Sequence, residues 1–453
     1  MSVSRKKIVI IGGVAAGMSA ASRARRNDPQ AEITVFEKSG DVSYGSCGLP
    51  YYISDDIKDA KELVAISAED FREKRNIDVR LWCEGLRFDR RKKLVEVRNL
   101  KTGEEENYAY DKLVIATGAQ AIMPNLPGIN LKNVFVVRTL QDGIAVKKII
   151  ETHKPKNAVV IGGGYIGLEM AEALTVSGVK VSVVEQLDRL VANIDKNMSA
   201  LVEKELIDHG CEIYKSNGLR EISGAGVVEK VHLMRGDEIP ADMVIMAVGV
   251  RPNIGFAKRS GVELGQTGAI KTDARMRTNI NDVYAAGDCA EAKNLITGRG
   301  DYIPLGTTAN KQGRVAGDNV SGGHSQFKGV VGTAVVKIFN LEVARTGLSE
   351  EAALKLFNAR SVVVKGKSRA GYYPNPAEIT VRLHFIPGEG RLLGAQMIGR
   401  EGVAQRINLF AAAIQEKINL QKLSEWDLAY APPFAPVWDV VLITVNQALK
   451  IKR

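Results

Sequence analysis

The sequence predicts an α/β protein in which one βαβ unit occurs twice and is followed by a smaller α+β domain. In the first unit, a buried apolar strand runs into a glycine turn over residues 7–17, and the same pattern returns over residues 158–167. From about Val330 the pattern changes to alternating strands, within residues 378–398, next to a helical segment at 403–416. With 453 residues, the chain is long enough for two to four domains.

The first unit consists of the strand and glycine turn at residues 7–17, a helical segment from Met18 to Arg26, and a second apolar run at 33–36 that ends in Glu37. A glycine turn lets a pyrophosphate approach the helix N-terminus, and the acid accepts the ribose hydroxyls. This unit therefore predicts a dinucleotide site, although Val14 stands in the place of the middle glycine.

The second unit has all three glycines in register within residues 162–167, followed by a helix at 168–177 and a strand at 181–185 that ends in glutamate. Each unit is followed by an apolar strand that leads to a glycine turn, at 113–118 and at 243–249. A whole dinucleotide-binding domain is therefore repeated, and we expect two nucleotide sites.

Other segments complete these domains. Residues 78–110 have the pattern of a β meander inserted in the first domain. Residues 283–285 form a strand that delivers Asp288 beyond a glycine, and another helix starts within residues 304–310. The proline-rich aromatic stretch at 430–438 is too apolar for an exposed tail, so we expect it to pack against something, such as a second subunit.

Charge and cysteine content limit the possible functions. Lys and Arg outnumber Asp and Glu by 62 to 52, which gives a net charge of +10. This excess suits a phosphate-bearing ligand, whereas the scattered basic residues lack the aromatic interleaving of a nucleic-acid groove. The four cysteines, Cys47, Cys83, Cys211 and Cys289, form no CxxC pair, which argues against zinc and against a secreted disulfide framework.

The N-terminal region contains no targeting signal that we can identify. The apolar run at residues 8–11 is too short for a signal-peptide core, and no stretch approaches membrane-spanning length. Together with the cysteine usage, this predicts a soluble cytoplasmic protein without a membrane partner.

Cys47 is the candidate nucleophile, within Ser43–Tyr51. It lies between a loop and a predicted helix start, where Pro50 is tolerated in the first turn. The helix dipole there is expected to lower the pKa of the thiol and to favour the thiolate. By itself, an isolated cysteine is more often a small buried hydrophobic residue, so the rest of the sequence has to decide.

The two dinucleotide repeats, the Asp288 segment and the C-terminal α+β domain together resemble the pyridine nucleotide-disulfide oxidoreductase superfamily over essentially the whole chain. The resemblance implies two Rossmann-like dinucleotide-binding domains, for FAD and NAD(P)H, and a C-terminal dimerisation domain. Residues 1–120 and 250–328 would form the FAD-binding domain, 121–249 the NAD(P)H-binding domain and 329–453 the dimerisation domain of a homodimer.

The number and spacing of the redox cysteines indicate which subgroup of this superfamily the chain resembles. Relatives of glutathione reductase carry two cysteines five positions apart, but Val42 and Tyr52 occupy those positions around Cys47. NADH oxidases and peroxidases of the single-cysteine kind have a histidine in the first glycine turn, near Ala15 here. Residues 46–51 and 430–433 instead resemble coenzyme A disulfide reductases and CoA-dependent persulfide or polysulfide reductases.

The resemblance also implies the residues of each site. The residues expected at FAD are Gly12, Gly13, Ala15, Gly17, Glu37, Lys38, Ser46, Cys47, Thr117, Gly118, Asp288 and Ala309. The residues expected at NAD(P)H are Gly162, Gly163, Gly164, Tyr165 (as the gate over the flavin), Ile166, Glu185 and Gly249. The residues expected at coenzyme A are Ser19, Arg23, Arg26, Ser43, Arg75 and Asn310. Glu185 favours NADH over NADPH, because a carboxylate repels a 2′-phosphate, although Arg189 lies close to it in the sequence.

The implied chemistry is reduction of a CoA-linked sulfur substrate, which is CoA disulfide, CoA persulfide or polysulfide. NADH would reduce the flavin, and the flavin a mixed disulfide between Cys47 and CoA, with Tyr372 and Tyr430 of the partner subunit assisting the leaving group. Three alternatives stay open: an NADH oxidase or peroxidase that uses Cys47 as a sulfenic acid, an electron-transfer flavoprotein reductase, and a non-enzymatic protein that retains FAD.

Overall fold

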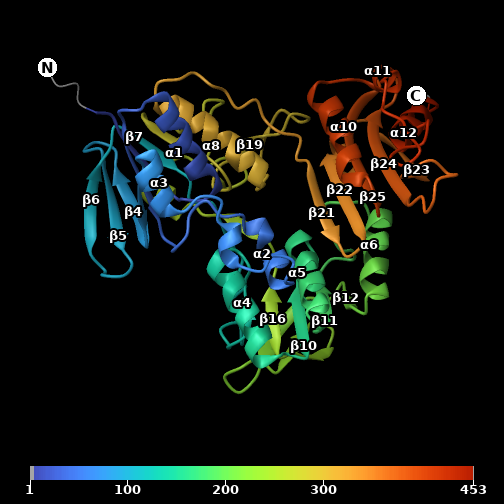
Figure 1. Cartoon of the computed structure of the whole chain (residues 1–453), viewed down its shortest axis with the longest axis horizontal. Helices are drawn as coiled ribbons and strands as arrows, with labels where there is room; N and C mark the ends of the chain where they lie inside the picture. The colour runs from blue at the N-terminus through green and yellow to red at the C-terminus, as the bar shows by residue number, and fades with distance from the viewer. Residues whose placement is uncertain (1–4, 452–453) are drawn as a thin grey trace.

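The computed structural model describes residues 5–451. Figure 1 shows three lobes, formed by an N-terminal α/β unit, a second α/β unit below it and a C-terminal α+β unit. None of the helices in residues 5–451 combines the length and the apolar character needed to cross a membrane.

The first lobe is built on a five-stranded parallel sheet with the order β18-β7-β1-β2-β3. Its strands read as apolar runs because both faces are covered. The sheet strands are β1 (Lys7–Ile11), β2 (Glu32–Glu37), β3 (Asp78–Leu81), β7 (Lys112–Ile115) and β18 (Val283–Ala285). The helices of this lobe are α1 (Ala15–Asn27), α3 (Ala68–Arg75), α7 (Gly255–Arg259) and α8 (Gly306–Val320).

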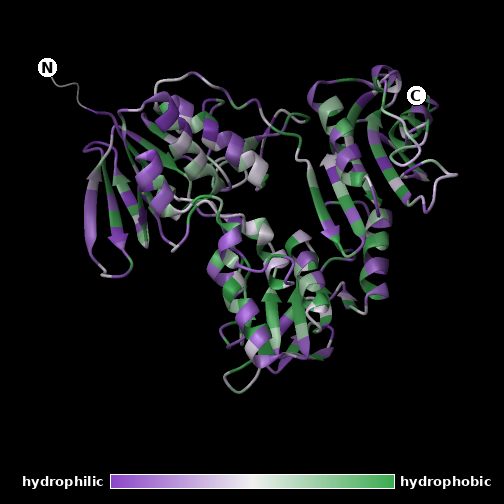
Figure 2. Cartoon of the chain, in the orientation of Figure 1, coloured by the Kyte–Doolittle hydropathy of each residue, from purple (hydrophilic) through white to green (hydrophobic). Residues whose placement is uncertain are grey.

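The second lobe repeats this plan, with the sheet order β9-β16-β10-β11-β12 and parallel pairing throughout. Figure 2 shows its central strands in green, as expected for a sheet buried between helices. The sheet strands are β9 (Val134–Phe135), β10 (Asn157–Ile161), β11 (Lys180–Glu185), β12 (Glu212–Lys215) and β16 (Met243–Met246). Its helices are α4 (Leu140–His153), α5 (Tyr165–Val176) and α6 (Lys196–Asp208).

The predicted internal repeat is confirmed at the level of backbone geometry. Gly12 and Gly162 have φ angles of 105° and 109°, in the region that favours glycine. A Cβ atom on Gly17 would lie 1.8 Å from the carbonyl oxygen of Gly12, and one on Gly167 would lie 1.9 Å from that of Gly162. Only glycine allows each helix to start so close to its turn.

The first and the second lobe each also contain a small antiparallel sheet. The predicted meander exists as β4 (Cys83–Asp89), β5 (Leu94–Asn99) and β6 (Glu105–Ala109), but its expected first part is wrong, because residues 78–81 pair with β2 in the parallel sheet. The second lobe has a corresponding meander that sequence analysis missed, formed by β13 (Leu219–Ser223), β14 (Lys230–Leu233) and β15 (Glu238–Pro240). Two antiparallel segments, β8 (Ala119–Ala121) and β17 (Val250–Pro252), pair where the chain passes between the lobes.

The C-terminal lobe contains an antiparallel sheet with the order β21-β22-β25-β24-β23. Its strands are β21 (Ala334–Ile338), β22 (Leu341–Gly347), β23 (Arg360–Lys367), β24 (Glu378–Ile386) and β25 (Arg391–Gly399). Its helices are α9 (Glu350–Leu356), α10 (Val403–Gln415), α11 (Leu420–Ser424) and α12 (Val440–Leu449). A short pair, β19 (Ala292–Lys293) and β20 (Gly300–Asp301), precedes this lobe in the chain. The expected strands and helix between residues 378 and 416 are therefore confirmed.

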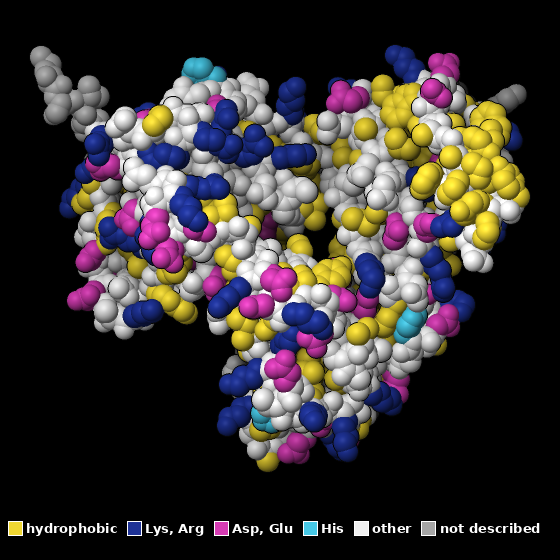
Figure 3. Space-filling model, viewed as in Figure 1, with side chains coloured by type: hydrophobic (Ala, Val, Ile, Leu, Met, Phe, Trp, Pro, Cys, Tyr) yellow, Lys and Arg dark blue, Asp and Glu magenta, His cyan; other side chains and the backbone are white. Residues whose placement is uncertain are grey.

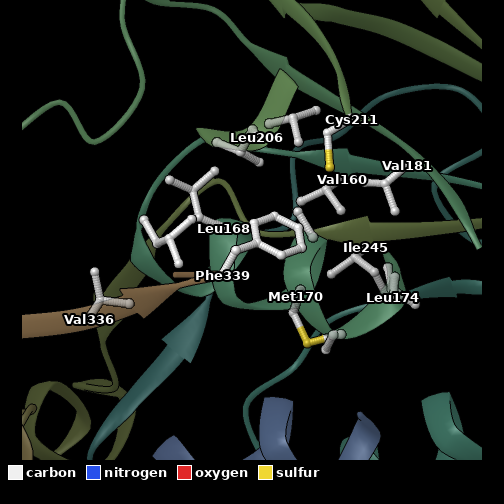
Figure 4. Close-up of a cluster of buried hydrophobic side chains, with 14 of the residues drawn as sticks. Val160, Leu168, Met170, Leu174, Val181, Leu206, Cys211, Ile245, Val336 and Phe339 are labelled. Atoms are coloured by element: carbon white, nitrogen blue, oxygen red, sulfur yellow. The ribbon is translucent and has the colours of Figure 1, made fainter. Parts of the chain in front are cut away.

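A shared hydrophobic core joins the second lobe to the C-terminal lobe. Figure 4 shows Phe339 among Leu168, Met170 and Ile245 of the second lobe, with Val336 at the edge of the same cluster. The backbone N–H of Phe339, in the turn after β21, also donates to Glu172 of α5 at 2.7 Å. The apolar contact and the hydrogen bond fix the orientation of α5 relative to the C-terminal sheet.

A buried ionic cluster also connects the second lobe to the C-terminal lobe. The carboxylate of Asp195, which directly precedes α6, lies 2.8 Å from Arg382 and 3.1 Å from His384 of β24. Its backbone N–H donates to Gln396 of β25 at 2.9 Å. Despite its burial, Asp195 has a lowered pKa because His384, a backbone N–H and Arg382 stabilise the ionised form.

Helices α1 and α8 pack unusually closely. A Cβ atom on Gly313 would lie 2.2 Å from the carbonyl oxygen of Ala16, and one on Gly317 would lie 2.3 Å from that of Ala20. Because both obstacles are backbone atoms, a side chain can be accommodated only if the helices separate. This contact therefore holds α1, and the glycine turn that precedes it, against α8.

We expect Gly313→Ala to destabilise the protein, because about 1–3 kcal/mol of overpacking outweighs the gain in helix propensity. The thermal unfolding temperature of the FAD-loaded protein measures the effect. Gly306→Ala, in the first turn of α8, is the matched control, because a Cβ atom there has no neighbour within 4 Å. Equal unfolding temperatures for the two variants would contradict the close packing.

Candidate active site

The glycine turn after β1 packs closely against the end of β2 and has no room for a side chain at Gly13. The backbone N–H of Gly13 donates to Oε2 of Glu37 at 2.7 Å, and that of Ser39 donates to Oε1 at 2.8 Å. A Cβ atom on Gly13 would lie 2.6 Å from Val42. The carboxylate is thus fixed at the end of β2, beside the start of α1, where a dinucleotide places its ribose and pyrophosphate.

The second glycine turn has the same arrangement around Glu185. The backbone N–H groups of Gly163 and Leu187 donate to its two carboxylate oxygens, each at 2.8 Å. Gly164 directly precedes the first residue of α5, Tyr165, and Ile166 is 38% exposed. The predicted acid and glycines of this site therefore lie together around the N-terminus of α5.

Asp288 has a partner that the sequence did not reveal. Nη2 of Arg138 lies 2.8 Å from its carboxylate, and both side chains are largely buried. Close by, the hydroxyl of Tyr302 is buried without a hydrogen-bond partner among residues 5–451, and burial raises its pKa. A polar group of a bound cofactor would satisfy this hydroxyl, so the residues present fit the expected FAD site.

Most other residues predicted for FAD lie around this first sheet. Thr117 follows β7, and its hydroxyl donates to the carbonyl of Asn253 at 2.6 Å. Gly118 and Gly249 adopt positive φ angles of 68° and 111° at corresponding turns of the two lobes. Ala15 begins α1 and Ala309 is buried in α8, whereas the side chain of Lys38 is exposed.

Cys47 lies in a 3₁₀ turn, Ser46–Gly48, that leads into the short helix α2 (Leu49–Ile53). Pro50 is in the first turn of α2, as expected. The packing of α2 against α4 and α5 places the cysteine where the two nucleotide-binding lobes meet. Lys147 of α4 holds this arrangement, because its ammonium group donates to the carbonyl of Tyr52 at 2.9 Å.

The prediction that the helix dipole lowers the pKa of the Cys47 thiol is wrong. Burial raises the pKa of Cys47, and the carboxylate of Glu169 raises it further, whereas Arg138 lowers it. Helix α2 has little more than one turn and follows a 3₁₀ turn, so its dipole is too small to offset the increase in pKa that desolvation causes.

Glu169 is a site residue that the sequence analysis missed. It lies one helical turn after Tyr165 on α5, so the two side chains share a face. Burial, together with the nearby Glu172, raises the pKa of Glu169 to about 7. Its spacing from the predicted gate residue was the signal that could have identified it. A carboxyl group that titrates near neutral pH beside the cysteine can hold or release a proton there.

Glu169→Gln tests this electrostatic contact. As the pH rises through about 7, Glu169 ionises and opposes formation of the Cys47 thiolate. We therefore expect the variant to lower the pKa of Cys47 and to raise its alkylation rate at pH 8 by about three- to tenfold. The inflection near pH 7 in the wild-type pH profile of alkylation should disappear.

The matched control is Glu151→Gln, which removes an exposed carboxylate from α4. It should leave the alkylation profile of Cys47 unchanged. Identical pH profiles for Glu169→Gln and the wild type would show that Glu169 does not act on the thiol.

The residues predicted for coenzyme A are only partly brought together. The hydroxyl of Ser19 donates to Asn310 at 2.6 Å, and this bond links α1 to α8. Arg23, by contrast, is engaged with Asp318, at 2.7 Å, and is not a free phosphate ligand. Hydrogen bonds from Asn27, Ser325 and Arg23 hold the pKa of Asp318 well below the usual range.

The remaining predicted CoA residues lie at two places along α1. Arg75 is at the end of α3, with its guanidinium 3.5 Å from the hydroxyl of Ser22. Arg26 is exposed in the last turn of α1, and Ser43 has a φ angle of 52° in the loop before Cys47. Arg26 and Arg75 therefore both contact Ser22 near the end of α1, whereas the backbone N–H of Ser43 donates to Gly13 at the first glycine turn, at 2.9 Å.

The two predicted tyrosines lie in the C-terminal lobe. The hydroxyls of Tyr372 and Tyr430 are 2.7 Å apart. Tyr372 belongs to the loop between β23 and β24, on the far side of this lobe from α2 in Figure 1. The structure of one chain therefore does not bring them to Cys47.

An exposed apolar patch surrounds these tyrosines. Its members are Tyr372, Tyr430, Phe434, Val437 and Trp438, which are 45–78% exposed. Figure 3 shows hydrophobic side chains gathered along this edge of the C-terminal lobe. The stretch at 430–438 thus leaves large side chains uncovered within one chain, as a subunit interface would.

Comparison with known proteins identifies the family. Residues 6–313 match the family described as pyridine nucleotide-disulphide oxidoreductase, and residues 333–440 match the dimerisation domain of the same family. The chain belongs to this family. The family assignment confirms the predicted fold and the use of FAD and a pyridine nucleotide.

Three similar proteins differ in the reaction that their names describe. The NAD(P)H coenzyme A polysulfide/persulfide reductase of Pyrococcus horikoshii is 40% identical over 441 residues, 97% of each chain. The crystal structure of reduced Bacillus anthracis CoADR-RHD has a TM-score of 0.96 and 37% identity, and the match covers 98% of this chain and 80% of that one. An NADH oxidase of Methanocaldococcus jannaschii is 37% identical over 446 residues, 98% of this chain and 99% of its own.

Proposed function

We propose that this pyridine nucleotide-disulphide oxidoreductase reduces a CoA-linked sulfur substrate through Cys47. The observation that carries the proposal is the single cysteine between the two nucleotide-binding lobes. Among residues 5–451, no cysteine forms a disulfide with Cys47: Cys83 is in β4, and Cys211 and Cys289 are buried in the cores of the two lobes. A disulfide at Cys47 must therefore include a sulfur atom of the substrate. The relative from Pyrococcus horikoshii, whose name specifies CoA polysulfide or persulfide, supports this substrate class.

The residues around Cys47 suggest how the reaction proceeds. The Cys47 thiolate attacks one sulfur of CoA disulfide, forms a mixed disulfide and releases one CoA thiolate. When bound, FAD and NAD(P)H supply the two electrons that reduce this mixed disulfide. The carboxyl group of Glu169 acts electrostatically on Cys47 and has a pKa of about 7, so it would hold a proton close to the sulfur.

We propose further that the active site is completed by the partner subunit of a homodimer. The dimerisation domain supports the homodimer. The paired hydroxyls of Tyr372 and Tyr430, within an exposed apolar patch, suit a role across the subunit interface. There they would hydrogen-bond to the sulfur of the leaving group. The bonding of Glu185 to its glycine turn supports a preference for NADH, and the four free cysteines support a reducing, cytoplasmic setting.

Mass spectrometry and steady-state kinetics test this function. We expect purified protein treated with CoA disulfide to carry an adduct of the mass of CoA on Cys47, which NADH removes. NADH-dependent turnover should be faster with CoA disulfide, CoA persulfide or polysulfide than with oxygen. If oxygen consumption is the fastest reaction and no CoA adduct forms, the protein is an NADH oxidase instead.

A further inference from the structure

An ion pair connects α5, the helix that carries Glu169, to the C-terminal lobe. The ammonium group of Lys337, on β21, is paired with Oε1 of Glu172. The other carboxylate oxygen, Oε2, accepts the backbone N–H of Phe339 at 2.7 Å. The side chain of Glu172 is only 12% exposed. Both oxygens of this carboxylate are therefore held by the C-terminal lobe, and its charge has a fixed place on α5.

The charge of Glu172 acts on the active site through its neighbour on the helix. Glu172 lies three residues after Glu169, so the two carboxyl groups share one face of α5. A neighbouring negative charge disfavours ionisation, and this repulsion adds to the effect of burial in raising the pKa of Glu169 to about 7. Besides burial, the carboxylate of Glu169 raises the pKa of Cys47. The state of Glu172 therefore influences the thiol.

The positive charge of Lys337 opposes this repulsion. It lies against the Glu172 carboxylate, so the pair presents a smaller net charge to Glu169 than a lone carboxylate would. The ammonium group is about half exposed, and solvent therefore reduces its effect without removing it. Within residues 5–451, neither Glu169 nor Glu172 takes part in any other ion pair.

The other titratable and charged groups near the thiol do not replace Lys337. Burial and the two carboxylates of α5 raise the pKa of Tyr51, on α2, to about 12, so its phenol stays neutral. Arg138 lowers the pKa of Cys47, but its own charge is paired with Asp288, which raises that pKa. The cation that offsets the acidic face of α5 therefore comes from the C-terminal lobe.

We propose that Lys337 is a positioning residue of the active site, whose charge offsets that of Glu172 and so lowers the pH at which Glu169 releases its proton beside Cys47. The C-terminal lobe thus acts on the chemistry of the site as well as carrying the dimerisation domain. The part that Cys47 plays in turnover rests on the proposed function, whereas the effect on its thiol does not.

The pH dependence of Cys47 alkylation tests this effect without any substrate. The FAD-loaded protein is treated with dithiothreitol and desalted, and alkylation of the Cys47 peptide is followed by mass spectrometry. The inflection near pH 7 reports the ionisation of Glu169. We expect Lys337→Gln to move this inflection upward by about 0.5 in pH, and Glu172→Gln to move it downward by a similar amount. The double variant should lie between the two.

Opposite shifts distinguish an electrostatic effect from loosened packing, because a weaker contact between α5 and the C-terminal lobe would affect both single variants in the same way. Lys337→Arg keeps the charge and should keep the wild-type inflection. Lys365→Gln breaks an exposed ion pair with Glu378 in the same sheet and should leave the inflection in place. Shifts of the same sign, no shift, or an inflection that persists in Glu169→Gln would overturn the proposal.

Steady-state kinetics separate this proposal from the proposed function. The pH dependence of kcat/KM for CoA disulfide should have an inflection that moves in the same two directions in Lys337→Gln and Glu172→Gln. If the wild type reduces no CoA-linked substrate, the proposed function fails, and the alkylation profiles still decide whether Lys337 acts on Glu169.

Discussion

Cys47→Ser is expected to abolish reduction of CoA-linked sulfur substrates while leaving the protein folded and loaded with FAD. Cys47 keeps solvent access in its 3₁₀ turn, although the surrounding protein desolvates the thiol enough to raise its pKa, and its side chain is not part of the apolar core beneath α2. A serine therefore fits the same space but cannot form a disulfide. We expect turnover to fall by at least about a thousandfold, as for loss of a nucleophile.

The two half-reactions separate this chemical effect from misfolding. In a stopped-flow experiment, NADH should still bleach the flavin absorbance of Cys47→Ser at close to the wild-type rate. The reduced variant should then fail to be reoxidised by CoA disulfide. Cys83→Ser is the matched control, since Cys83 lies in the small meander of the first lobe, and it should retain full turnover. Undiminished turnover of Cys47→Ser would remove the central mechanism.

The parts of this molecule that could be predicted from sequence follow from local backbone requirements. Gly12 and Gly162 have positive φ angles, and Gly17 and Gly167 lie very close to a backbone carbonyl. Only glycine satisfies these requirements, so the sequence has glycine at the same spacing in both units. The burial of parallel strands on both faces similarly forces continuous apolar runs. These signals were enough to reveal the two dinucleotide-binding lobes, whereas the identities of the nucleotides, FAD and NAD(P)H, came from the resemblance to a family.

The parts that could not be predicted depend on contacts between distant segments. Arg138 lies 150 positions from Asp288, and no spacing rule connects them. Whether Arg23 was free for phosphate depended on Asp318 of α8, 295 positions away. The pKa of Cys47 depended on burial and on Glu169, which comes from the other nucleotide-binding lobe. The residues that predict the start of α2 do not predict the pKa of Cys47, because the desolvation of the thiol depends on how α2 packs against α5.

A mixed-dimer experiment is expected to restore activity from two inactive proteins. One is Cys47→Ser, and the other is Tyr372→Phe/Tyr430→Phe, which lacks the paired hydroxyls. If the tyrosines act on the partner's cysteine, each heterodimer has one complete site, formed by Cys47 of one subunit and the tyrosines of the other. With random mixing, activity should recover to about a quarter of the wild-type value, because half of the dimers carry one good site out of two.

The opposite assignment gives a different result. If Cys47 and the tyrosines of the same chain worked together, no subunit in the mixture would contain a complete set, and activity would stay at the level of the separate variants. The control mixture of Cys47→Ser with the wild type should keep half of the wild-type activity if one site works independently of the other, and native mass spectrometry of the mixture shows that the subunits have exchanged. The location of the tyrosines, on the far side of the C-terminal lobe from α2, favours recovery. The exposed apolar patch around them, which a partner subunit would cover, supports the same outcome.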